Sequence, residues 1–193
     1  MSHSSQNGSG SQSSSQIDHN SQSGRNSPAR RIAFYALATA AACVLSGLES
    51  MIPLPTPAPG IKLGLANTVT LILLLGGRNP AYAAAVTAMR CILAALLFGA
   101  LSSLVFSLAG GLASCLVMWA LLRLGNAFSP IGASVAGALT HNMSQLAAAS
   151  LIARDLAIFG YMPVLLAAGA AAGIATGYVA LKANSIICLI NNR

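Results

Sequence analysis

The clearest shortage in this sequence is charge. Charged residues make up 7% of the 193 residues and hydrophobic residues make up 55%, whereas ordinary soluble domains carry about 25% charged residues. A surface so poor in charge cannot face water on all sides, so we predict an integral membrane protein. The length suits a single compact domain.

Acids are scarcer still, because only Asp18, Glu49 and Asp155 are present. Magnesium prefers oxygen ligands and usually takes carboxylates, so metal-assisted diphosphate chemistry is not expected. The sequence also has no His/Cys metal spacing and no phosphate loop of the GxxxxGK[ST] kind. A Ser/His/Asp triad would have to bring Asp155 to His141 across half a bilayer. We therefore expect no catalytic residues, no metal and no cofactor.

A cysteine-based motif and nucleic-acid binding are not expected either. The four cysteines form no CxxC pair, which is typical of small buried hydrophobic side chains. The net charge is +7, but the basic residues are scattered singly and build no basic face, so nucleic acid is not an expected partner.

What the sequence has in abundance is long apolar stretches. Residues 1–29 are rich in Ser, Gln, Asn and Gly and are predicted to be a disordered tail. Residues 30–185 are predicted to form an all-α membrane domain, followed by a short C-terminal tail at 186–193. Its six expected transmembrane helices cover 32–52, 61–76, 80–98, 102–123, 130–152 and 161–181. Asn79 and Ser129 are predicted N-caps, each followed by a proline at the first helical position.

The orientation follows from the basic residues at the helix ends. An even number of helices places both termini on one side, together with Arg25, Arg30, Arg31, Arg78, Arg123, Lys182 and Arg193. The other side has Lys62 and Arg154. The positive-inside rule then predicts that both termini lie in the cytoplasm of a cell-membrane protein. The proline-rich stretch 53–60 therefore faces outward, as a stiff lid.

Arg90 is the most informative polar residue. It lies about ten residues into its helix, so it is ~15 Å deep at 1.5 Å per residue, with no acid expected in mid-membrane to neutralise it. One interpretation is that Arg90 binds an anionic group of a ligand. The alternative is that it caps carbonyl groups or snorkels to the interface.

The sequence THNMSQ supplies a second polar group. His141, Asn142 and Gln145 are expected on one helical face, at a depth close to that of Arg90. They predict either a polar pocket shared with Arg90 or interhelical hydrogen bonds.

The outer ends of the helices add further candidates for the binding site. Asn67, Gly110 and Gly111 lie one to two turns from the outside, and the glycines leave room for a ligand or a neighbouring helix. Lys62 either contacts the ligand or forms a salt bridge with Glu49. The sequence does not decide whether Glu49 pairs with Lys62 or with Arg90.

Small residues are dense, as in AGGLAS at 109–114 and AAGAAAGIATG at 167–177. In the first helix, Ala36 and Ala40 have small-xxx-small spacing. Such faces allow close helix packing in lipid, either inside the protein or against another membrane protein.

Three stretches carry a resemblance to a known family: LESMIPLPTPAPGIKLGLANTVTLI, SLAGGLAS and FSPIGASVAGALTHNMSQL. Over residues 32–182 the chain resembles heptaprenyl diphosphate synthase component I, also called the Gx transporter family. The resemblance implies a fold similar to the six-helix substrate-binding components of energy-coupling factor transporters. Those proteins bind a small molecule and depend on a transmembrane coupling protein and two ATPases. Their first helix has an Ala-xxx-Ala docking motif, which Ala36 and Ala40 match.

The sequence therefore predicts a membrane-embedded, substrate-binding component of a transporter for a small, vitamin- or cofactor-like, anionic molecule. The expected partners are that ligand, membrane lipid and energising proteins. The alternative is a non-catalytic membrane component associated with heptaprenyl diphosphate synthesis, since the chain has none of the aspartate-rich motifs of prenyl synthases.

Overall fold

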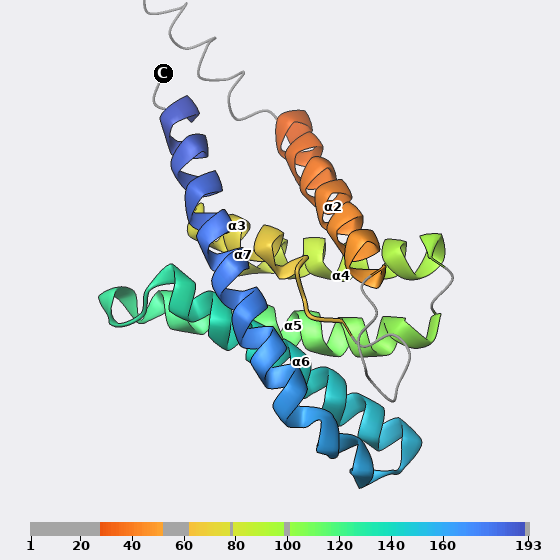
Figure 1. Ribbon diagram of the computed structural model, residues 1–193. Coiled ribbons are helices and arrows are strands. Elements are labelled where there is room, and N and C mark those ends of the chain that lie inside the picture. Colours follow the sequence, from red (N-terminus) through yellow and green to blue (C-terminus); the bar gives the residue numbers. More distant parts are fainter. Residues whose placement is uncertain (1–27, 52–61, 78, 99–100, 192–193) are drawn as a thin grey trace, which may run out of the picture. The chain divides into compact units, whose positions relative to one another are not determined.

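The computed structural model describes residues 28–51, 62–77, 79–98 and 101–191. These residues contain α-helices and two short 3-10 helices, and no strand. The chain divides into two compact units, residues 1–37 and 38–193, and the candidate site lies in the second. The helices are α2 (Pro28–Ser50), α3 (Asn67–Leu75), α4 (Pro80–Leu97), α5 (Leu101–Arg123), η1 (Gly125–Ala127), α6 (Pro130–Ala153), η2 (Leu156–Tyr161) and α7 (Met162–Asn191) (Figure 1).

Two helix starts are as the sequence predicts. The Asn79 side chain accepts a hydrogen bond of 3.0 Å from the backbone of Ala81, and the Ser129 hydroxyl accepts one of 3.0 Å from Gly132. In both cases proline follows the cap, because its missing N–H costs nothing in the first turn. The caps confirm the predicted beginnings of α4 and α6.

Two other boundaries differ from the prediction. Helix α3 begins at Asn67 rather than near 61, because Gly64 has a φ of 87° and the backbone around it is not helical. Helix α7 continues to Asn191, into the stretch that was predicted as a tail. The first limit depends on a turn, which an apolar pattern does not reveal, whereas the second follows the apolar residues at 186–190, which continue the helix.

Four segments of the described chain are long and apolar enough to cross a membrane: Pro28–Ser50, Pro80–Leu97, Ser103–Arg123 and Leu156–Leu189. Helix α3 has 9 residues, which is ~14 Å at 1.5 Å per residue and too short alone. Helix α6 has 24 residues, but its many polar side chains keep it out of this set. The structure thus indicates a membrane protein and confirms the all-α class.

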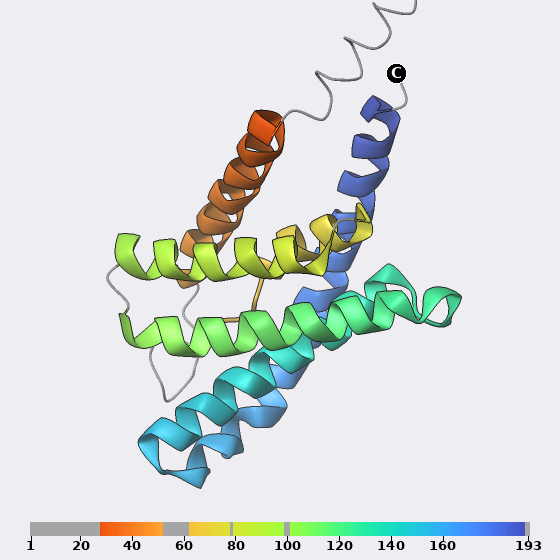
Figure 2. The same ribbon diagram turned by 180° about the vertical axis from the view of Figure 1, so that it is seen from behind.

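Glycines on α7 bring it close to α6, beside which it runs in both views (Figures 1 and 2). A Cβ on Gly173 would lie 2.8 Å from the Cα of Val135, and one on Gly177 would lie 3.0 Å from the Cα of Ile131. A Cβ on Gly169 would lie 2.3 Å from the amide nitrogen of Asn142. Of the two interpretations of the 167–177 stretch, internal packing is the one observed for these glycines.

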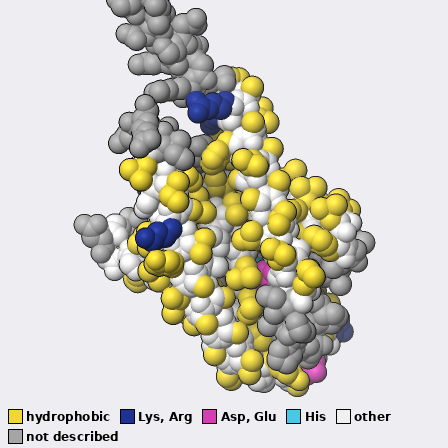
Figure 3. Space-filling view, turned by 45° about the horizontal axis from the view of Figure 1, so that its top comes forward, with side chains coloured by type: hydrophobic (Ala, Val, Ile, Leu, Met, Phe, Trp, Pro, Cys, Tyr) yellow, Lys and Arg dark blue, Asp and Glu magenta, His cyan; other side chains and the backbone are white. Residues whose placement is uncertain are grey.

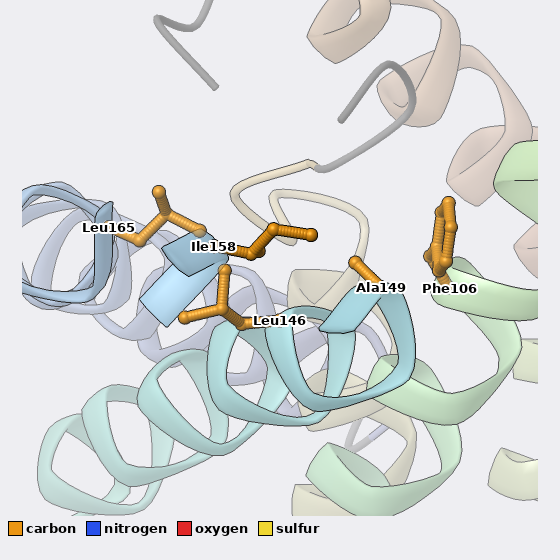
Figure 4. Packing of buried hydrophobic residues seen from close by; sticks show 5 residues of the cluster. All are labelled: Phe106, Leu146, Ala149, Ile158 and Leu165. Atoms are coloured by element: carbon orange, nitrogen blue, oxygen red, sulfur yellow. The ribbon is translucent and has the colours of Figure 1, made fainter. Parts of the chain in front are cut away.

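A small apolar cluster closes one end of this helix pair (Figure 4). Leu146 and Ala149 of α6 pack with Ile158 of η2, Leu165 of α7 and Phe106 of α5. The side chains of Leu146, Ile158 and Leu165 point toward one another in Figure 4. Elsewhere within the described residues many polar side chains are buried together with apolar ones such as Leu71 and Met118, so the interior of the second unit is not purely apolar.

The outer surface is strongly apolar instead. Large hydrophobic side chains such as Leu37, Leu96, Leu116 and Ile174 are more than half exposed, and Figure 3 shows hydrophobic atoms over most of the visible face. A soluble protein rarely exposes apolar patches of this extent. Polar residues inside and apolar residues outside are the distribution expected of helices that face lipid.

We predict that Gly173→Leu destabilises the α6–α7 pair. The new side chain would meet backbone atoms of α6, which cannot rotate away, at a cost of about 1–3 kcal/mol. Gly160→Leu is the matched control, because a Cβ there meets nothing within 4 Å. Unfolding by SDS in mixed micelles measures both. Equal stability of the two variants would contradict the packing described here.

Candidate functional site

Arg90 of α4 is only 3% exposed and lies in a polar cluster in the centre of the second unit. Its Nη1 donates to the Ser46 hydroxyl at 3.1 Å and its Nη2 donates to Asn67 Oδ1 at 3.0 Å. The Asn67 amide in turn donates to Ser114 Oγ at 3.0 Å. Nε is buried and has no hydrogen-bond partner. Arg90 is therefore held by neutral oxygens from α2 and α3, and its Nε donor is left unused.

Glu49, at the end of α2, is 2% exposed. Its carboxylate accepts hydrogen bonds from the backbone N–H groups of Gly64 and Leu65. Arg90 and Lys62 interact electrostatically with the same carboxylate. The sequence left open whether Glu49 pairs with Lys62 or with Arg90; the end of α2 brings Glu49 into the cluster, where both bases act on its carboxylate.

His141 and Gln145 of α6 form the other half of the cluster. Gln145 Nε2 and His141 Nε2 are 3.0 Å apart, and Gln145 Oε1 accepts a hydrogen bond of 2.9 Å from the backbone N–H of Lys62. His141 Nδ1 faces Gly110 without a hydrogen bond of ordinary geometry.

The segment 62–66 joins the two halves of the cluster. A Cβ on Gly64 would lie 2.9 Å from Asn67 Nδ2 and 2.9 Å from His141 Cδ2. Gly64 also has a φ that L-residues rarely adopt. Only glycine can place this turn between Asn67 and His141 while its N–H reaches Glu49. The segment thus closes one side of the polar cluster.

Gly110 and Gly111 of α5 leave room for neighbouring side chains. A Cβ on Gly110 would lie 2.8 Å from His141 Nδ1, and one on Gly111 would lie 2.8 Å from Thr87 Cγ2 and 3.3 Å from Arg90 Nη2. The sequence left open whether these glycines admit a ligand or a neighbouring helix. Within the described residues, the space beside them is filled by α4 and α6.

Asn142 does not share the orientation of its neighbours. It lies about 100° around α6 from His141, and its Nδ2 donates to the carbonyl oxygen of Leu165 on α7 at 2.7 Å. Its Oδ1 is buried without a partner. The expectation of one polar face holds for His141 and Gln145, and the spacing i, i+1 explains why Asn142 faces α7 instead.

Sequence reasoning missed Ser46, Ser114 and the buried hydrogen bond between Thr70 and Thr87. A signal existed for the two serines. Ser46 lies three residues before Glu49, and Ser114 lies four after Gly110, so each shares a helical face with a residue already singled out. Small hydroxyl side chains are common in membrane helices, which hides this signal among structural serines.

The lid and docking predictions concern other residues. Ala36 and Ala40 are both exposed on α2. The proline-rich stretch 53–60 and Arg78 lie outside the described residues. The lid function and the docking function both stay predictions, as does the ligand-binding role of the polar cluster.

Comparison with known families gives one match of wide coverage. The family model described as heptaprenyl diphosphate synthase component I matches residues 38–183. This range contains the whole polar cluster, from Ser46 to Gln145. No curated protein and no solved structure matches the chain.

We predict that Asn67→Leu destabilises the protein by about 2 kcal/mol, because it leaves a buried guanidinium with one hydrogen bond fewer. Ser114→Ala removes only a neutral hydrogen bond from the same asparagine and should cost under about 1 kcal/mol. SDS unfolding of both variants gives the comparison. If the two losses are equal, Arg90 does not depend on Asn67.

Proposed function

Because the chain belongs to the heptaprenyl diphosphate synthase component I family, we propose a function for it within a membrane: it binds a small anionic molecule for transport. It is the substrate-binding component, and partner proteins supply the energy. The six apolar segments cross the cell membrane with both termini in the cytoplasm, and the short α3 is sheltered from lipid by its neighbours.

The observation that supports this proposal most is the buried guanidinium of Arg90 with an unused Nε donor. A charged group inside a membrane protein is costly unless it has a task or full pairing. The cluster contains the positive charge of Arg90 and feels that of Lys62, and Glu49 is its one acid among the described residues. A surplus of positive charge in a dry interior favours a ligand with a phosphate or carboxylate group.

Entry of a ligand requires the segment 62–66 to move. Hydrogen bonds from its backbone to side chains of the cluster help to hold it, among them those from Lys62 to Gln145 and from Gly64 to Glu49. Both acceptors are side chains of the proposed site, so a ligand that takes those side chains also releases the segment. Lys62 and Asn67 then lie at the entrance, while His141 and Gln145 offer hydrogen bonds from the opposite wall.

We expect purified wild-type protein to retain a small anionic molecule that is detectable by mass spectrometry, and Arg90→Ala to lose it. Arg90→Lys keeps the charge but loses the planar donors, so it should retain the molecule at reduced occupancy. Arg154→Asn is the control, since it removes an exposed base outside the cluster and asparagine tolerates its φ of 54°.

Each variant must elute as a single species, which separates ligand loss from misfolding. If well-folded Arg90→Ala and wild type retain the same amount, or if no molecule is retained by any form, Arg90 is not the anion site.

The exposed alanines of α2 fit the proposed docking of a coupling protein. Ala36 and Ala40 are one turn apart on an exposed face that also includes Leu37 and Val44. Small side chains let a partner helix approach closely.

We therefore expect Ala40→Leu to abolish co-purification of a membrane partner while ligand retention is unchanged. Ala85→Leu, at an exposed alanine of α4, is the matched control and should preserve the complex. Affinity purification from the native membrane, with quantification of bound proteins, measures this. Equal recovery of partners by the two variants would remove α2 as the docking face.

The family name favours a second candidate, a non-catalytic membrane component of heptaprenyl diphosphate synthesis. The two candidates differ in what the purified chain does. Prenyl synthase activity that appears only after a soluble subunit is added, with no retained small molecule, would support this second function.

A further inference from the structure

The basic residues of the chain show a spacing that the polar cluster does not explain. Five of them have an aromatic residue four positions away, on the side toward the expected membrane helix. The pairs are Arg30–Phe34, Arg31–Tyr35, Arg78–Tyr82, Arg123–Trp119 and Lys182–Tyr178. In the first three the base precedes the aromatic residue, and in the last two it follows. We refer to these ten residues as the basic–aromatic set.

Chance does not account for this spacing. Aromatic residues are 5% of the chain, so among the seven bases expected on the cytoplasmic side fewer than one such pair is expected. Five of those seven have it. Lys62 and Arg154, expected on the other side, have no aromatic residue four positions away in either direction. The spacing therefore distinguishes one membrane surface from the other.

In the second unit, the structure brings two of these pairs into contact. The Arg123 guanidinium lies 5.3 Å from the centroid of the Trp119 ring, and Lys182 Nζ lies 5.8 Å from that of Tyr178. Both distances are within the range of a cation–π interaction. Both bases are exposed, so each ring holds its cation without covering it.

The position of these two pairs along their helices fits one lipid surface. Lys182 is 20 residues after the start of α7 and Arg123 is 22 after the start of α5, which is ~30–33 Å at 1.5 Å per residue. That is about the thickness of the hydrocarbon core. Exposed apolar side chains lead up to each pair, Leu112 and Leu116 on α5 and Ile174 on α7. Each pair therefore lies where a lipid-facing stripe meets the headgroups.

We propose that the Arg123–Trp119 and Lys182–Tyr178 pairs bind the phosphate groups of anionic phospholipids in one leaflet. Each base contacts a headgroup, and the aromatic ring one turn deeper occupies the ester region, where Trp and Tyr are favoured. Lipid fits better than an acidic protein, because the pairs belong to different helices rather than one patch. Figure 3 shows basic side chains in separate small groups on a hydrophobic surface.

Trp119 is the sole tryptophan of the chain, so its fluorescence reports the lipid beside Arg123. The full-length protein is placed in nanodiscs that contain brominated phosphatidylglycerol or brominated phosphatidylcholine at equal mole fraction. We expect the site beside Trp119 to prefer the anionic lipid over phosphatidylcholine about fivefold. This is the size of effect expected when one basic side chain lies near an anionic surface. Bromines near the ester end of the acyl chain should quench more than bromines near its methyl end.

Arg123→Gln should remove this preference, Arg123→Lys should keep most of it, and high salt should weaken it. Arg154→Asn is the control and should leave the preference unchanged. Equal quenching by the two lipids in the wild type, or an undiminished preference in Arg123→Gln, overturns the proposal. A loss of a co-purified acidic protein from Arg123→Gln, with no lipid preference, would assign these pairs to a protein interface and would also overturn it.

Discussion

The structure depends on how a single guanidinium is held inside an apolar set of helices. Arg90 lies in the interior and donates to Ser46 and Asn67, so α2, α3 and α4 are joined by one side chain. Asn67 extends the connection to Ser114 of α5. Removing a charged donor or acceptor from such a network leaves the remaining groups unpaired in a medium without water, and this cost fixes the relative positions of these helices.

The rest of the polar centre follows from the need to satisfy that charge and Glu49 at once. The backbone of 62–66 approaches both halves of the cluster, with Gly64 donating to Glu49 and Lys62 to Gln145. The glycines at 64, 110 and 111 permit this closeness, because any Cβ there would meet a polar side chain of the cluster. The same small residues that promote helix packing in lipid therefore also shape the proposed binding site.

The proposed ligand site and the basic–aromatic set use positive charge in different ways. Arg90 is buried, where charge acts strongly because the surroundings screen it little. Arg123 and Lys182 are exposed, where charge acts mainly through its proximity to an anionic surface. A chain with so few charged residues thus has cations in two environments, buried and exposed, within the part that the structure describes.

The sequence by itself determined the all-α class, the membrane character and the caps at Asn79 and Ser129, because these depend on composition and on neighbours a few residues away. It also predicted that Arg90, His141 and Gln145 are polar residues at similar depth, since helical rise converts residue number into depth. The tertiary structure decided which groups meet. Glu49 in the same cluster as Arg90, Asn142 turned to α7 and Gly64 between Asn67 and His141 all depend on how helices distant in sequence rotate and pack. Periodicity fixes a side chain's place on its own helix, but the partner it faces depends on the neighbouring helix.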